Sequence, residues 1–332
     1  MKHALAFILT VLLIVPGNGM LRSRAPASKP GPKETIAHQF LEMERPLGAG
    51  DHHRAYLDGL IERARRKIGA ANISNTAGAA AVLRNIDALL REEGFRFKSN
   101  YLLFRGIDSR SIDCDNYSAL YVSIGETLGI PILPVYAPNH SFLRIYFEDG
   151  SYMNWEATEG KSLPDAHYLE TLRVEASSLR LGVYMKTLSR MEFLGVEYNT
   201  MGACLMTAGR YAEALPFFDR AVRHYPQFSS AYHNRGSSKY AMGRREAALE
   251  DLLEAKRLDP GRASTRNTLG DIHFDGREYD RAIEEYLASI RLDPCFYAPY
   301  ASIGLVMRAR GDEEGARTWL RKAEEVKKKK CY

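Results

Sequence analysis

The sequence predicts a protein of two parts, an α+β domain followed by an all-α solenoid. About 40% of the chain, at its C-terminal end, repeats with a period of 34 residues. Before the repeats, one mostly apolar helical segment is followed by three short segments with the composition of β-strands. The length of 332 residues leaves room for about two domains.

The first 19 residues predict export. Lys2 precedes an apolar run, Ala4–Val15, that is too short to cross a bilayer, since a spanning helix needs about 20 apolar residues. We therefore expect a signal peptide over residues 1–19 and a periplasmic or extracellular protein. Arg22 and Arg24 are unusual behind a cleaved signal, so an uncleaved segment that anchors the protein to the membrane is the alternative.

The α+β domain is expected over residues 49–190, after a linker at 20–48 that begins with many Pro, Ser and basic residues. The domain combines two amphipathic helices, a more apolar helix that Asp113 helps to cap, and an antiparallel sheet. The helices are expected at Ala49–Ala70, Ala79–Glu93 and Cys114–Leu128, and the strands at Ile132–Tyr136, His140–Phe147 and Tyr152–Thr158.

Four repeats are expected at 195–228, 229–262, 263–296 and 297–328. Small residues return every 34 positions, at Gly202, Gly236, Gly270 and Gly304 and at Ala214, Ala248, Ala282 and Ala316. They allow the two helices of a repeat to approach closely, and large residues such as Phe218, Leu252, Tyr286 and Leu320 fill the gaps. This pattern resembles the tetratricopeptide repeat (TPR) family. The resemblance implies a helical solenoid that stacks as one folding unit.

A TPR stack implies a concave groove that binds a protein or peptide. The glycine register places polar, nearly uncharged residues toward that groove, namely Asn199, Thr200, His233, Asn234, Asn267, Thr268 and Ser302. Asn side chains suit hydrogen bonds to an extended peptide backbone, whereas a carboxylate clamp would need Lys and Arg. A solenoid that serves only as a spacer is the alternative.

Three residues of the α+β domain form a candidate catalytic triad. Cys114 lies at the expected first turn of a helix, where unpaired N–H groups and the helix dipole lower a thiol pKa. His140 could take the thiol proton, and Glu156 could orient the imidazole. Asn154 is the rival for the third position. The backbone N–H of Cys114 is one expected oxyanion donor.

Other residues around this thiol bear on its activation. Asn100 and Tyr101 are the candidates for a second oxyanion donor. Asp113 and Asp115 flank Cys114, and their negative charge disfavours a thiolate. We interpret these two carboxylates mainly as helix-capping residues.

The turn between the second and third strands decides whether His140 and Glu156 can meet. Side chains alternate between the two faces of a strand. A two-residue turn would put the two residues on opposite faces, whereas the three-residue turn Asp149–Ser151 would put Glu156 opposite Arg144 and on the face of His140. We therefore predict an odd-numbered loop with Gly150 in a left-handed conformation.

Four segments together resemble the transglutaminase-like superfamily of papain-related thiol enzymes. They are Asp113–Tyr121, Leu128–Pro131, Pro138–Arg144 and Asn154–Thr158. The resemblance covers roughly residues 80–330 and is closest to bacterial members with TPR repeats behind the catalytic domain. It implies an α+β transglutaminase-like fold and the roles of Cys114, His140 and Glu156 as nucleophile, base and orienting acid. Most of the superfamily has Asp at the third position, and no counterpart of its upstream oxyanion Gln is visible.

Other functional classes find little support. The formal charge is +5, and the basic run Lys327–Lys330 is a short solvated tail, so no nucleic-acid partner is expected. No cofactor fingerprint occurs, and the pair His52–His53 has no matching ligand cluster, so neither a cofactor nor a metal is expected. Cys204 is expected in the repeat core, and whether Cys295 and Cys331 pair stays open.

Two functions from different classes remain. The first is an exported cysteine hydrolase or acyltransferase that acts on amide bonds of a protein or peptide while the repeats bind a partner. The second is a non-catalytic interaction scaffold in which the thiol fold has become a binding module. The sequence identifies no substrate and does not separate hydrolysis from cross-linking.

Overall fold

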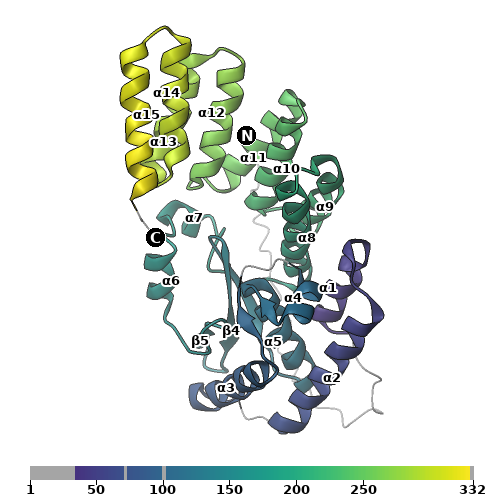
Figure 1. Ribbon diagram of the computed structural model, residues 1–332. Coiled ribbons are helices and arrows are strands. Elements are labelled where there is room, and N and C mark those ends of the chain that lie inside the picture. The colour runs from purple at the N-terminus through teal and green to yellow at the C-terminus, as the bar shows by residue number, and fades with distance from the viewer. Residues whose placement is uncertain (1–33, 71–72, 99–101, 330–332) are drawn as a thin grey trace, which may run out of the picture. The chain divides into compact units, whose positions relative to one another are not determined.

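The computed structural model describes residues 34–70, 73–98 and 102–329. The expected signal peptide, Arg22, Arg24, Asn100, Tyr101 and Cys331 therefore lie outside the described residues. Residues from Glu34 onward form one unit, with an N-terminal α+β region followed by a helical array (Figure 1). None of the described helices is long and apolar enough to cross a membrane.

The N-terminal region consists of short and medium helices around two small sheets. The helices are α1 (Ile36–Glu44), the 3-10 turn η1 (Arg45–Leu47), α2 (Asp51–Ile68), α3 (Thr76–Glu92), α4 (Leu103–Ser109), α5 (Cys114–Leu128), α6 (Asp165–Thr171) and α7 (Ala176–Arg180). The strands are β1 (Arg96–Phe97), β2 (Ser111–Ile112), β3 (Leu133–Ala137), β4 (His140–Tyr146) and β5 (Tyr152–Trp155). β1 and β2 pair in parallel, and β3, β4 and β5 form an antiparallel sheet in that order.

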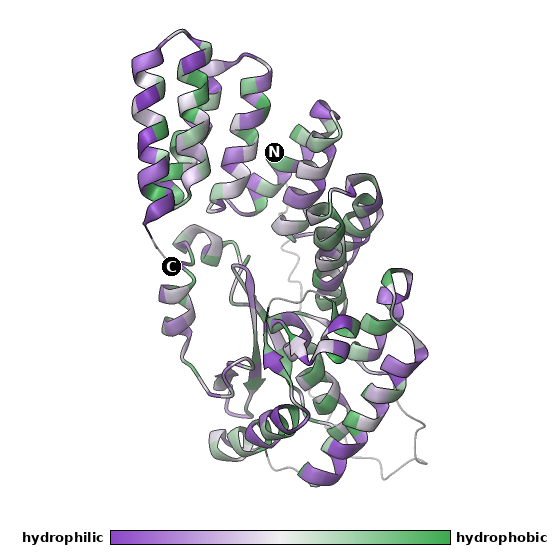
Figure 2. Ribbon diagram, viewed as in Figure 1, coloured by the Kyte–Doolittle hydropathy of each residue, from purple (hydrophilic) through white to green (hydrophobic). Residues whose placement is uncertain are grey.

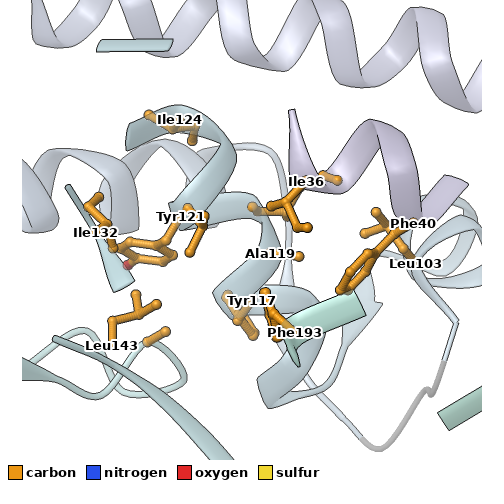
Figure 3. Packing of buried hydrophobic residues seen from close by; sticks show 14 of the residues in the cluster. Ile36, Phe40, Leu103, Tyr117, Ala119, Tyr121, Ile124, Ile132, Leu143 and Phe193 are labelled. Carbon is orange, nitrogen blue, oxygen red and sulfur yellow. The ribbon is translucent and has the colours of Figure 1, made fainter. Parts of the chain in front are cut away.

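The prediction of a linker over residues 20–48 is wrong for its second half. Residues 36–44 form α1, and Ile36, Ala37 and Phe40 are at most 1% exposed. Their apolar side chains pack in the core with those of α5 and with Phe193 of the first repeat helix (Figure 3). A helix that buries this much apolar surface contributes to the fold and is no flexible connection.

The central helix matches its prediction at both ends. α5 begins at Cys114 because Asp113 takes the N-cap position and its side chain accepts from the Asn116 backbone N–H. It ends at Leu128 because Gly129 adopts a left-handed conformation, φ 72°, that favours glycine. Most of its residues are buried, so the helix forms the centre of the core.

The repeats form four helix pairs. They are α8 (Arg190–Thr207) with α9 (Tyr211–His224), α10 (Ser229–Ala241) with α11 (Arg245–Leu258), α12 (Ala263–Asp275) with α13 (Tyr279–Leu292), and α14 (Tyr297–Ala309) with α15 (Glu313–Lys328). Polar and apolar residues alternate along α15, as expected for a helix with one buried side (Figure 2).

The predicted glycine register describes the helix crossings in atomic detail. A Cβ on Gly202, Gly236, Gly270 or Gly304 would lie 2.5 to 2.9 Å from the large residue predicted to pack there. Those residues are Phe218, Leu252, Tyr286 and Leu320. Only glycine therefore allows the two helices of each pair to keep their spacing.

Candidate functional site

The candidate nucleophile, Cys114, occupies the first position of α5. It is a free, partly exposed cysteine. The preceding strand residue Ile112 is fully buried and paired with Phe97, so the chain enters the helix in a fixed direction. The backbone N–H of Ser141, in β4, donates to the Cys114 sulfur and favours the thiolate. The thiol is thereby linked to the strand that carries His140.

His140 and Glu156 meet in the structure. His140 Nε2 lies 2.7 Å from Glu156 Oε2, and their side chains are 18% and 4% exposed. The other carboxylate oxygen, Oε1, accepts from the Thr158 backbone N–H at 3.1 Å and from its hydroxyl at 2.5 Å. Glu156 is thus held from both sides, with one oxygen directed at the imidazole.

The strand register explains this meeting. Arg144 pairs with Asn154 and Tyr146 with Tyr152, so Phe147 lies opposite Ser151 across the three-residue loop Glu148–Gly150. The odd-numbered loop and the left-handed Gly150, φ 82°, agree with the prediction. The loop begins one residue earlier than predicted, so Arg144 faces Asn154 rather than Glu156. The parity is unchanged, and His140 and Glu156 share one face.

Asn154, the rival third member, is engaged elsewhere. Its side-chain oxygen accepts from Arg144 Nε at 2.7 Å, and its amide donates to Asp165 Oδ1 at 2.6 Å. Arg144 also donates to Asp165 at 2.9 Å, which closes a polar triangle in which Arg144 and Asn154 are buried. The structure therefore brings Glu156, and not Asn154, to the imidazole.

Tyr168 of α6 belongs to the site, although the sequence analysis missed it. Its ring stacks on Phe142 with centroids 3.8 Å apart and lies 6.3 Å from the His140 ring. It is 1% exposed, so it covers the imidazole from solvent on that side. The sequence held no signal for this residue because α6 is a short helix distant from the triad segments.

The electrostatic surroundings hold the thiol protonated. Burial raises the pKa of Cys114 well above its usual range, and the charges of Asp115 and Asp113 raise it further. By contrast, the pKa of Glu156 is lowered: burial alone would raise it, but the hydrogen bond and charge of His140, with help from Thr158, outweigh burial. Glu156 is therefore the ionised acid of the site, and Cys114 is not yet an activated nucleophile.

Four carboxyl groups lie together near the thiol, three of them buried and one, Asp115, partly exposed. Burial raises the pKa of each, and the group comprises Glu44 at the end of α1, Asp113 and Asp115 at the start of α5, and Glu197 in α8. Glu44 accepts from the backbone N–H groups of Leu103 and Phe104, at 2.7 and 2.9 Å. Asp115 accepts from the hydroxyl of Ser141. These acids connect the thiol to the junction with the repeats.

The pair His52–His53 has a third potential ligand that the sequence analysis did not find. Asp108 of α4 lies 3.2 Å from His53 Nε2, and one ligand atom of each of the three residues lies within 4.8 Å of the others. His53 Nδ1 accepts from the Gly50 backbone N–H at 2.8 Å, which leaves the ring proton on Nε2. Nε2 is buried and makes no hydrogen bond to the described residues, although it lies near Asp108.

Several of the residues expected in the repeat groove make hydrogen bonds within the stack. Asn234 donates to Asn199 at 2.9 Å, and His233 lies 3.2 Å from the Thr265 hydroxyl. Burial, with the charge of Arg262, lowers the pKa of His233 to about 3, so this imidazole is neutral. The polar ladder therefore stabilises the stack.

Comparison with known proteins identifies the repeats. Family models described as tetratricopeptide repeat match residues 196–228 and 233–294. Protein FlbA of Caulobacter vibrioides is 45% identical over 56 residues, which are 17% of this chain and 9% of FlbA, so the chain spans only a small part of that relative.

Solved structures resemble part of the chain. The crystal structure of MamA shares 28% identity over 41% of this chain and 80% of its own, with a TM-score of 0.38. YrrB, titled a TPR protein with an unusual peptide-binding site, shares 20% identity over 50% of this chain and 84% of its own, with a TM-score of 0.36. The family-model matches, and not these structures, show that the C-terminal part of the chain contains TPR repeats. The transglutaminase-like resemblance of residues 80–190 remains a prediction.

Proposed function

We propose that this protein is a cysteine-dependent amidase or acyltransferase whose TPR repeats bind a protein or peptide partner. The observation that carries the catalytic part is the 2.7 Å contact between His140 Nε2 and Glu156 Oε2 beside the helix start at Cys114. Export of the protein, to the periplasm or cell exterior, or its anchoring to a membrane through the N-terminal segment, is part of the same proposal.

The proposed reaction depends on which ring nitrogen of His140 is hydrogen-bonded to Glu156. Because the carboxylate holds Nε2–H, Nδ1 is the atom that can take the Cys114 proton. The resulting thiolate attacks the amide carbon, and the tetrahedral intermediate collapses to a thioester while the leaving amine takes the proton from Nδ1. Water or an amine then gives a proton to Nδ1 and attacks the thioester, which releases the acid or the transferred amide and restores the thiol.

The second candidate is a non-catalytic interaction scaffold. The raised pKa of Cys114, caused by burial and by Asp115 and Asp113, favours it. The comparisons also support this candidate more directly, because both family-model matches lie in the repeats and none of them concerns catalysis. In this case the His140–Glu156 pair would stabilise the sheet without taking part in a reaction.

Alkylation with iodoacetamide near neutral pH separates the two candidates. The labelling of Cys114 is followed by peptide mass spectrometry, and Cys204, also free, is the internal control. Burial raises the pKa of Cys204 to about 11, so it should react slowly in every variant. Rapid labelling of Cys114 that His140→Ala abolishes supports the enzyme. Labelling as slow as that of Cys204, with no effect of His140→Ala, excludes it.

A further inference from the structure

A cavity lies between the His140 turn and the loops of the repeats. Its volume is about 520 Å³, within the roughly 300–1,000 Å³ of ligand-binding sites. One side is formed by Pro138–His140 and by α6 and α7, and the other by the loops that enter α12 and α14. Of the three triad residues, only His140 lines it. The cavity therefore reaches His140 and extends from there to the loops of the repeats.

The repeat side of this cavity is fixed to the N-terminal α+β region by buried hydrogen bonds. Asp259, 2% exposed, accepts from the Ser178 hydroxyl and from the Tyr184 hydroxyl, each at 2.6 Å. Arg262 donates to Ser230 at 2.6 Å and to Tyr184 at 3.3 Å. Because buried polar groups are costly to separate once paired, this network holds the two sides at a constant distance.

Close packing at Gly261 also holds the two sides of the cavity together. A Cβ at this residue would lie 3.0 Å from the Glu175 side chain and 3.0 Å from the Ser178 hydroxyl. The loop before α12 thus lies directly against α7. The repeats form a permanent wall of the cavity, in the same unit as His140.

The chemistry of the lining suits an uncharged polypeptide segment. Arg262 and Asp259 compensate each other, and Arg173 lies 3.9 Å from Asp293. The rest of the lining includes both polar and apolar side chains, namely Asn139, Thr171, Leu172, Ser264, Leu292 and Phe296. Glu175 also lines the cavity, and its charge is screened because the residue is exposed to solvent. Because the other four charges have partners, a charged ligand would gain little, whereas a peptide can offer backbone amides to the polar groups and side chains to Leu292 and Phe296.

We infer that this cavity receives a neutral peptide segment of the substrate and that the second and third repeats select it. The inference rests on the proposed function only in treating the bound peptide as part of the substrate. Peptide binding itself can be tested without the thiol. It assigns selection to the inter-repeat loops beside His140 rather than to the polar groove, where several side chains are already hydrogen-bonded within the stack.

Binding is tested with the full chain carrying Cys114→Ala. Peptides are selected from a random display library, and the affinity of one synthetic selected peptide is measured by fluorescence anisotropy. Phe296→Ala and Ser264→Trp, both in the wall, should each weaken binding about tenfold, as truncation or filling of a central contact does. Tyr297→Ala and Leu253→Trp make the same kinds of change at exposed positions that do not line the cavity, and should change affinity less than about twofold.

Two outcomes overturn the inference. One is a library that yields no peptide whose binding depends on Phe296 and Ser264 while both variants keep the wild-type melting temperature. The other is a bound peptide that leaves iodoacetamide labelling of Cys114 in the wild-type chain unchanged, since a peptide seated beside His140 should slow it at least about fivefold. If peptide binding depends on the wall but labelling does not depend on His140, the proposed enzyme fails and the binding cavity stands.

Discussion

Replacement of Asp115 by Asn should raise the reactivity of Cys114. The negative charge of Asp115 is the largest cause, after burial, of the raised thiol pKa. At roughly 6 Å, the spacing of neighbouring helix residues, and an effective dielectric constant near 20, two unit charges interact by about 3 kcal/mol. Because Cys114 is partly exposed, solvent screens part of this interaction. We therefore expect about half of that energy, which lowers the thiol pKa by about one unit.

The assay is the rate of Cys114 alkylation by iodoacetamide, measured between about pH 6 and 9 for the wild type and Asp115→Asn. Below the thiol pKa, one unit corresponds to about a tenfold faster reaction at each pH. Asn keeps an oxygen that can accept from Ser141, so the packing should survive. Labelling of Cys204 in the same molecule should not change. An unchanged or slower rate at Cys114 would show that Asp115 does not control the thiolate.

Three further perturbations test other parts of the structure. Glu156→Gln should lower any amide-directed activity roughly 10²–10⁴-fold, as loss of a positioned acid–base partner does, and an unchanged kcat/KM would remove Glu156 from the site. Gly270→Ala should lower the free energy of unfolding by about 1 kcal/mol, because its Cβ would lie 2.5 Å from Tyr286, whereas Gly59→Ala, which meets only the flexible end of Arg63, should raise it by up to about 1 kcal/mol; urea unfolding should show the opposite signs. Burial raises the pKa of Glu44 from 4.5 to about 7, so its stabilising protonation is complete below about pH 4.5 and is lost as the pH rises through about 7; urea midpoints should be higher near pH 5 than near pH 8, and Glu197→Gln, which removes the neighbouring acid, should reduce that difference.

The sequence predicted those features that depend on local periodicity. The bounds of α5 follow from Asp113 and Gly129, a cap and a stop that act within a few residues. The meeting of His140 with Glu156 followed from strand parity, because an odd loop puts both residues on one face whatever its exact position. The one-residue error in the loop therefore changed the partner of Arg144 and left the pair intact.

Features that depend on tertiary contact were not predictable in this way. Residues 36–44 were assigned to a linker because the basic and Pro-rich residues before them dominated the composition, yet Phe40 packs against Phe193, distant in the sequence, with ring centroids 5.3 Å apart. Tyr168 and the cavity wall at Phe296 have no spacing relation to the triad. The groove residues lie on the first helix of each repeat, but only the structure reveals that several of them are hydrogen-bonded within the stack.

One group of acidic residues extends from Cys114 to the first repeat helix. The group runs from Asp115 beside the thiol, through Asp113, to Glu44 and Glu197, and the charges of Asp113 and Asp115 contribute to the raised pKa of Glu197. Glu197 belongs to α8, the first repeat helix, and Glu44 holds the start of α4 through two backbone N–H groups. Any movement of α8 that admits water to these carboxyls would lower their pKa values, increase the negative charge near Cys114 and disfavour its thiolate further. Close docking of α8 therefore keeps the pKa values of these acids raised, which favours their neutral forms and reduces the opposition to thiol activation.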